Sequence, residues 1–300
     1  MRVLIVGCGY VGLPLGAELV RQGHQVFGLR RSALAEAELK AAGITPLHAD
    51  ITRPESLAKV PRDFEWVVNC TASGGGTADD YRKVYFDGNR NLIAHFSGSS
   101  LKKFIYTSST SVYAQNDGSV AVETSPTEPE ADTAKVLVET EKLLLAAASR
   151  SAERSPHPFP VVILRVAGIY GPGRGFAFKQ FLRGEARIEG DGARVMNMIH
   201  RDDLIGVIIA ALERGEAGQV YNVADNEPVS QRDYYAWLAG ELKQPTPPGI
   251  TADAEVWRKR GVTNKRVSNY KLRANLNYAF KFPDFRAGYA PEVARVKAEG

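Results

Sequence analysis

The segment VLIVGCGYVG, residues 3–12, most constrains what this 300-residue chain can fold into. A short apolar run leads into three glycines spaced as G-x-G-x-x-G, and a helical pattern follows. Gly7 permits a tight turn, Gly9 lets a pyrophosphate approach the backbone, and Gly12 lets helix and strand pack closely. Between a strand and a helix, this motif predicts a dinucleotide-binding loop; a glycine-rich turn without a ligand is the alternative. The predicted loop residues are Gly7, Gly9, Tyr10, Val11 and Gly12.

Short β-branched runs alternate with amphipathic segments through the first half of the chain. Strands are predicted at Val3–Val6, Gln25–Leu29, Trp66–Cys70, Phe104–Thr107 and Val161–Val166, with another short strand before Asp50. Helices are predicted at Gly12–Gln22, Ala33–Ala42, Asp79–Phe96 and Asp132–Ser149. This alternation requires a parallel sheet with helices on both faces, and right-handed crossovers make it doubly wound. The predicted fold class is α/β, a Rossmann-like doubly wound parallel sheet.

The pattern changes after residue 166. A glycine/proline turn at Gly171–Gly175 is followed by two short helical patterns, a buried strand within residues 219–225 and a loop at residues 243–253. We therefore predict a Rossmann domain of residues 1–166, to which residues 202–224 return. Residues 167–201 and 225–300 are predicted to form a smaller, discontinuous C-terminal lobe that binds the substrate.

Composition argues against several classes of protein. The net charge of +4 is slight and no long Lys/Arg run occurs, so no nucleic-acid partner is expected. No stretch is long and apolar enough to span a membrane, and no signal-peptide cleavage site follows the apolar N-terminal segment. Cys8 and Cys70 lie in apolar segments, which favours a reducing, cytoplasmic location. No metal site is predicted.

The end of the second predicted strand indicates which dinucleotide is preferred. An NAD site favours an acidic residue there, which hydrogen-bonds the adenosine ribose 2′-OH. The sequence instead has Arg30 and Arg31. Guanidinium groups suit a 2′-phosphate through charge-assisted hydrogen bonds. NADP is therefore the predicted cofactor and NAD the alternative, and a solvated arginine pair is the non-functional interpretation.

Several motifs after residue 47 occur in an order that resembles one known family. They are HADI (48–51), VNCTAS (68–73), YTSSTSVY (106–113), LRVAGIYGPG (164–173), GDGARVMNMIHRDDL (190–204) and YNVADNEPVS (221–230). Together they resemble the extended short-chain dehydrogenase/reductases, the NAD-dependent epimerase/dehydratase family, over residues 1 to about 240. One departure is the glycine motif, because extended members usually have G-x-x-G-x-x-G. The chain is thus similar to the atypical members.

The resemblance implies roles for residues at the carboxyl ends of the predicted strands, where open α/β sheets bind ligands. Ser109 matches the serine that hydrogen-bonds the reacting substrate oxygen, and Lys135 matches the lysine that holds the nicotinamide ribose. Asp50 and Ile51 would flank the adenine, and Val166 and Ile169 would lie near the nicotinamide. The other implied cofactor contacts are Cys70, Thr71, Ala72, Thr107 and Ser108.

The family's proton-transferring pair is Tyr-x-x-x-Lys, two residues on one helix face. In ADTAK, with Lys135 as the lysine, the tyrosine position is Ala131, whose methyl group cannot transfer a proton. Tyr113 is the candidate substitute, with Asp132 and Tyr170 as weaker ones and aromatic packing as the alternative for Tyr113.

The resemblance leaves the activity open between two classes. The first is an NAD(P)-dependent oxidoreductase or epimerase/dehydratase acting on a small carbonyl or alcohol, sugar-derived compounds included. The second is a non-enzymatic NADP(H)/NAD(H)-binding redox sensor, which the missing tyrosine favours. Met196 stands where sugar-nucleotide enzymes commonly have an arginine, which argues against a nucleotide-sugar substrate. Homodimerisation through the helices at Asp79–Phe96 and Asp132–Ser149 is compatible with their apolar residues.

Overall fold

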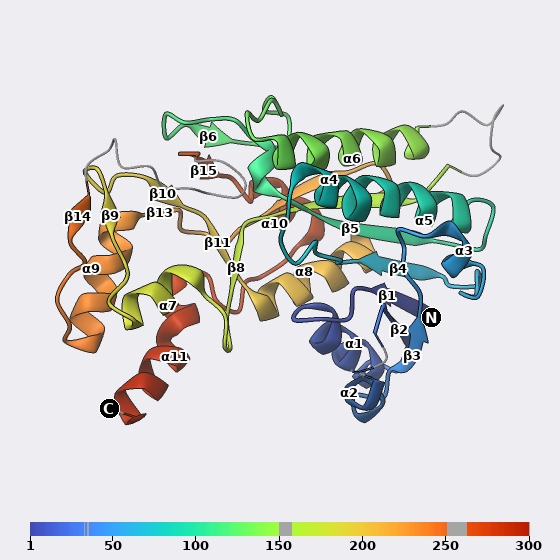
Figure 1. Cartoon of the computed structure of the whole chain (residues 1–300), viewed down its shortest axis with the longest axis horizontal. Coiled ribbons are helices and arrows are strands. Elements are labelled where there is room, and N and C mark those ends of the chain that lie inside the picture. Colours follow the sequence, from blue (N-terminus) through green and yellow to red (C-terminus); the bar gives the residue numbers. More distant parts are fainter. Residues whose placement is uncertain (33, 35, 150–157, 251–262, 300) are drawn as a thin grey trace.

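The computed structural model describes residues 1–300 except 33, 35, 150–157, 251–262 and 300. A central parallel sheet lies at the right of Figure 1, and a smaller lobe adjoins it at the left. The sheet has seven strands in the order β12-β7-β5-β4-β1-β2-β3, and all neighbouring strands are parallel. Their bounds are Arg2–Val6 (β1), Gln25–Arg30 (β2), Thr45–His48 (β3), Trp66–Asn69 (β4), Lys103–Ser109 (β5), Val161–Val166 (β7) and Val220–Val223 (β12). The predicted doubly wound sheet is confirmed.

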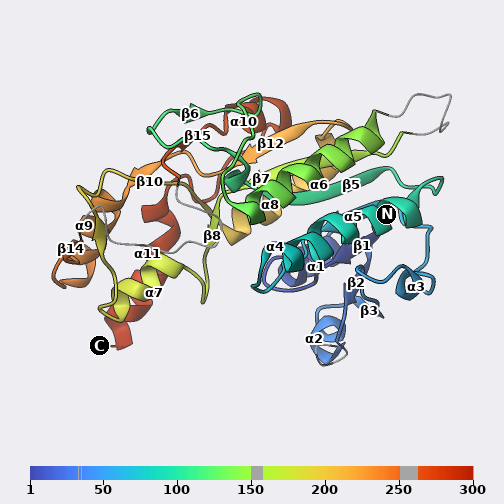
Figure 2. The same ribbon diagram turned by 45° about the horizontal axis from the view of Figure 1, so that its top comes forward.

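Helices cover both faces of this sheet, which is why β4 and β7 are buried along their whole length. One face carries α1 (Gly12–Arg21), α2 (Glu36–Ala41), α8 (Arg201–Arg214) and α10 (Tyr270–Leu276). The other carries α3 (Pro54–Leu57), α4 (Ala78–Tyr81), α5 (Gly88–Phe96) and α6 (Asp132–Ala148). Figure 2 shows α6 running alongside α4 and α5. No helix in the described part of the chain is long and apolar enough to cross a membrane.

The helix predicted at Asp79–Phe96 contains a π-helical turn, η2 (Arg82–Asp87), between α4 and α5. Asn89 Nδ2 donates to the Tyr85 carbonyl oxygen at 2.7 Å, so a side chain enters the backbone hydrogen-bond pattern there. Asn69 at the end of β4 in turn donates to Asn89 Oδ1 at 3.0 Å. This chain of amides fixes η2 relative to the sheet.

The smaller lobe has an aromatic core of its own. It contains α7 (Phe176–Leu182), α9 (Gln231–Leu242) and α11 (Phe285–Glu299), and the rings of Tyr170 and Tyr289 stack at 4.3 Å. Its strand pairs are β8 (Gly168–Tyr170) with β11 (Met198–His200), β9 (Ile188–Glu189) with β14 (Gly249–Ile250), and β10 (Val195–Met196) with β13 (Val229–Ser230). A further pair, β6 (Val120–Ala121) with β15 (Arg266–Val267), lies beside it.

One segment of the predicted substrate lobe contacts the sheet domain instead. Helix α10 packs on α8 and β12, and Leu272 and Leu276 are buried in the core beneath α8. Residues 270–276 thus belong to the packing of the sheet domain. The other predicted domain limits stay a prediction.

A buried ion pair joins α6 to the sheet. Arg165 on β7 makes three hydrogen bonds to the Glu141 carboxylate, the shortest from Nη2 to Oε2 at 2.7 Å, and both side chains are less than a tenth exposed. Ser108 Oγ donates to the same carboxylate at 2.5 Å, and Arg165 Nη1 donates to the Tyr113 hydroxyl at 2.8 Å. The network satisfies both charges with hydrogen bonds, as a buried ion pair requires.

Asp225, two residues after the end of β12, leads to a prediction about the pH dependence of stability. Burial raises the pKa of this carboxyl to about 8, so the folded state holds the proton more tightly than the unfolded chain does. The contribution of the protonated Asp225 to the free energy of unfolding is fully present below the unfolded pKa of about 4 and is lost as pH rises through 8. We expect Asp225→Asn to raise the free energy of unfolding at pH 8.5 by on the order of a few kcal/mol, and much less at pH 5.

Thermal unfolding of both proteins at the two pH values measures this difference. Asp79→Asn, at an exposed position, is the control and is expected to show no such dependence. Equal stability of wild type and Asp225→Asn at pH 8.5 would show that Asp225 is ionised at little cost.

Candidate active site

A cavity of about 1310 Å³ follows the carboxyl ends of β1, β2, β4, β5 and β7. This edge includes the point between β1 and β4 where the strand order reverses, the usual ligand site of open α/β sheets. We call it the dinucleotide cavity. It brings together most of the residues selected from the sequence: Gly7, Gly9, Tyr10, Val11, Arg30, Arg31, Asp50, Ile51, Cys70, Thr71, Ala72, Thr107, Ser108, Ser109, Val166 and Ile169.

Two glycines of the loop at one end of this cavity, Gly7 and Gly12, have no room for a side chain. Gly7 has φ of +90°, and a Cβ there would lie 2.8 Å from the Thr71 backbone. Gly12 does not line the cavity, but a Cβ there would lie 2.5 Å from the Gly7 oxygen and 3.0 Å from Ile5 Cγ2. Helix α1 begins with no side-chain cap and no acidic residue in its first turn. These features suit a phosphate at the helix N-terminus.

Two arginines line the cavity at the end of β2. Arg30 lies 3.4 Å from Glu38, a distance typical of a weak ion pair, and its side chain is 27% exposed. Arg31 is exposed, and no described carboxylate lies within salt-bridge distance of it. The cavity therefore has at least one guanidinium available for an anion at this end.

The surroundings of both cysteines favour the protonated thiol. Burial raises the pKa of Cys8 to about 12, and it raises the pKa of Cys70 as well. A thiolate at either position is therefore disfavoured at neutral pH. Cys70 lines the cavity as a small apolar group rather than as a nucleophile.

A second cavity of about 780 Å³ meets the first at Ser109. We call it the lobe cavity, because α7, α9, α11 and the β9 and β10 strands contribute its other walls. The residues common to both cavities are Ser109, Val166, Ala167, Gly168, Ile169, Gly175 and Phe176. Ser109 therefore lies where a ligand in one cavity would contact a ligand in the other.

Lys135 on helix α6 does not line either cavity, and its contact with a nicotinamide ribose stays a prediction. Lys135 Nζ pairs with Asp132 Oδ1 at 2.8 Å on the exposed side of the helix. Leu137 lines the dinucleotide cavity instead. Positions two residues apart in an α-helix point about 200° apart around its axis, so Lys135 and Leu137 cannot face the same side. Ala131 is the N-cap residue of α6, with ψ of 127°, and its carbonyl oxygen accepts from Lys135 N at 3.0 Å.

Tyr113 does not line either cavity. Its ring is fully buried, and its hydroxyl donates to Asn222 Oδ1 at 2.7 Å while accepting from Arg165. Burial raises the pKa of this phenol. The packing alternative therefore describes Tyr113, because both hydrogen-bonding roles of its hydroxyl are used inside the protein.

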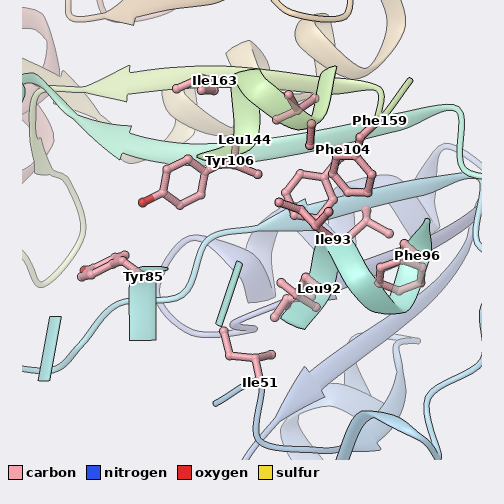
Figure 3. Packing of buried hydrophobic residues seen from close by; sticks show 14 of the residues in the cluster. Ile51, Tyr85, Leu92, Ile93, Phe96, Phe104, Tyr106, Leu144, Phe159 and Ile163 are labelled. Carbon is pink, nitrogen blue, oxygen red and sulfur yellow. The ribbon is translucent and has the colours of Figure 1, made fainter. Parts of the chain in front are cut away.

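The structure adds Tyr85, which sequence patterns alone did not indicate. Tyr85 lies on η2, lines the dinucleotide cavity and packs against the Tyr81 ring at 5.0 Å. Figure 3 shows its hydroxyl directed away from the hydrophobic cluster at whose edge the ring lies. Ser73 N donates to this hydroxyl at 3.3 Å, and no described group accepts its proton. A π-helical turn is a frequent sign of a functional site, but it is not readable from sequence.

Comparison with known proteins places this geometry in a family. Residues 3–224 match the family described as "NAD dependent epimerase/dehydratase family". Protein YeeZ of Escherichia coli is 28% identical over 94% of this chain and 97% of its own length. The 3-diazoavenalumate denitrifying reductase of a Streptomyces species is 26% identical over 97% of this chain and 100% of its own length. UDP-glucuronic acid 4-epimerase of Bacillus cereus, solved in complex with NAD, superposes with a TM-score of 0.81 over 100% of this chain and 99% of its own, at 22% identity.

Proposed function

Because the chain belongs to the NAD-dependent epimerase/dehydratase family, we propose that it is an NADP(H)-preferring enzyme that reduces or oxidises a small carbonyl or alcohol substrate. The dinucleotide cavity would hold the cofactor and the lobe cavity the substrate. The observation that carries this proposal is their meeting at Ser109, flanked by Val166 and Ile169.

The residues of the dinucleotide cavity fit a nicotinamide dinucleotide. Gly7 and the uncapped start of α1 would hold the pyrophosphate, and Arg30 and Arg31 the 2′-phosphate. Asp50 lines the cavity after the end of β3 and would lie at the adenosine. Its carboxylate accepts hydrogen bonds from Thr52 N and Oγ1, which hold the turn in place. A bound nicotinamide supplies or accepts hydride. The chain itself must orient the substrate and move a proton.

We assign these two tasks to Ser109 and Tyr85. Ser109 Oγ would hydrogen-bond the reacting substrate oxygen, as the family resemblance implies. On α6, the position one turn before the cavity-lining Leu137 is Thr133, so neither a phenol nor an ammonium occupies this face. Tyr85, on the neighbouring η2, would supply the proton instead. Its phenol is positioned by Ser73, and its main chain by Asn89.

An enzyme is favoured over a redox sensor by the relatives. The Streptomyces relative is named for a reduction and matches across its entire length. The sensor interpretation expects a cofactor site with no proton-transferring group, whereas Tyr85, which lines the same cavity, would be such a group. Homodimerisation stays a prediction.

The cofactor preference is testable by calorimetry. We expect NADP⁺ to bind more tightly than NAD⁺. The double substitution Arg30→Ala with Arg31→Ala would weaken NADP⁺ binding by about ten- to a hundredfold, because charge-assisted hydrogen bonds to the 2′-phosphate are lost. Binding of NAD⁺, which lacks that phosphate, would change little.

Arg21→Ala is the matched control, since Arg21 lies at the end of α1, pairs with Glu18 and does not line the cavity. It is expected to leave both affinities unchanged. Equal or tighter NAD⁺ binding by the wild type, indifferent to the double substitution, would contradict the assignment of Arg30 and Arg31.

A further inference from the structure

Lys265 is a buried cation in the wall of the lobe cavity. Lys265 is 3% exposed and lines this cavity. Its Nζ donates to Thr263 Oγ1 at 2.7 Å and to the Tyr113 carbonyl oxygen at 3.3 Å. Both acceptors are neutral. Within the described ranges, no carboxylate lies within salt-bridge distance of this ammonium. Burial lowers the pKa of Lys265 to about 8.

The backbone around Lys265 is held on both sides. Asn197 Nδ2 donates to the Lys265 carbonyl oxygen at 2.9 Å, and Asn197 Oδ1 accepts from Val267 N at 2.8 Å. Asn264 accepts from Val195 N at 2.9 Å. Because the segment is fixed between β10 and β6, the ammonium is held in the cavity wall rather than free to move to solvent.

The other charged side chains of the lobe cavity do not neutralise Lys265. Arg194 pairs with Glu189 at 3.1 Å. Glu185 is exposed and lies 3.9 Å from Arg183, and Arg187 donates to backbone carbonyl oxygens. The described lining therefore contains three basic groups and two acidic ones, with Lys265 as the buried excess charge. A buried ammonium without a counter-charge is unfavourable, so an anionic ligand would stabilise it.

We propose that Lys265 binds the carboxylate of a small oxo acid or hydroxy acid, whose reacting oxygen lies at Ser109. The 3₁₀ turn Thr110–Val112 separates Ser109 from Tyr113, the residue whose carbonyl contacts Lys265. At about 2 Å per residue the turn itself spans about 6 Å, and extended residues flank it, so the backbones of Ser109 and Tyr113 lie on the order of 10 Å apart, a span that a short acid and two side chains can cover. The proposal rests on the proposed function, and it names the substrate class of that site.

Calorimetry on the full chain saturated with NADP⁺ tests the proposal, because an oxidised cofactor cannot reduce a ketone. The probes are acetoacetate and 2-oxobutanoate, with their methyl esters as neutral counterparts. We expect at least one acid to bind about ten- to a hundredfold more tightly than its ester. Lys265→Met would remove this difference, and Lys142→Met, at an exposed position on α6, would preserve it.

A second measurement uses the wild type alone. The acid should bind progressively more weakly above pH 8, where Lys265 loses its proton, while ester binding stays constant. Acids that bind no better than esters, discrimination that survives in Lys265→Met, or inorganic phosphate that binds more tightly than either acid would overturn the proposal. If NADP⁺ fails to bind, the proposed function fails separately, and the same titrations without cofactor still test Lys265.

Discussion

Replacing Tyr85 by Phe is expected to lower the turnover number for carbonyl reduction by about 10²–10⁴-fold, the usual contribution of a positioned general acid. The substitution removes the hydroxyl but keeps the ring that packs on Tyr81. The Ser73 N–H would lose its acceptor, yet the glycine loop and Arg30 are untouched, so cofactor affinity should change little. The decrease is measured from absorbance at the nicotinamide band with a panel of small carbonyl compounds, oxo acids included.

Tyr81→Phe is the matched control, since Tyr81 lies one turn earlier in the same cavity. Its turnover number is expected to stay within a few-fold of the wild type. Undiminished turnover in Tyr85→Phe would mean that another group transfers the proton. Absence of turnover in the wild type across the panel would instead restore the redox-sensor interpretation.

The largest expected loss of stability follows from Glu141→Ala. The substitution leaves the Arg165 guanidinium buried without its carboxylate and removes the acceptor of Ser108. Breaking a buried pair in this way typically costs about 3–5 kcal/mol in the free energy of unfolding. The urea midpoint should fall accordingly, with an unchanged dependence on urea concentration if the native fold is retained.

Glu139→Ala provides a comparison on the same helix. Glu139 pairs with Arg82 at a half-exposed position, and such pairs contribute about 0–1 kcal/mol. If both substitutions lowered the urea midpoint equally, the buried network around Arg165 would contribute no more than a surface ion pair.

The strand-end residues were predictable from sequence because topology alone brings them together. Parallel strands of a doubly wound sheet end at one edge, so Gly7, Arg30, Asp50, Thr71 and Ser109 meet there whatever the loops do. This edge of the sheet could therefore be predicted from the glycine spacing, the alternation of strands and helices, and the order of the motifs.

The helix-borne part of the site was not predictable in the same way. Lys135 was selected by resemblance to the lysine of the family's Tyr-x-x-x-Lys pair, and a shift of two residues along a helix moves a side chain to the other side. The start of α6 at Asp132 and the burial of Leu137 fix this rotation. Tyr85 depends on a π-helical turn, and Lys265 enters from a segment far along the chain through contacts with Asn197. The rotation of α6, the π-helical turn and the position of Lys265 all depend on tertiary contacts, which a local sequence pattern does not reveal.

A crystal structure of the NADP⁺ complex tests the central claim most directly. We predict the pyrophosphate at Gly7–Gly12, the 2′-phosphate at Arg30 and Arg31, and the nicotinamide between Leu137 and Ile169. The space beside its reactive carbon should open into the lobe cavity, with Ser109 Oγ and the Tyr85 hydroxyl both within about 3 Å of one position for a substrate oxygen. A nicotinamide directed away from Ser109, or a Tyr85 hydroxyl that contacts only the protein in the complex, would contradict the account.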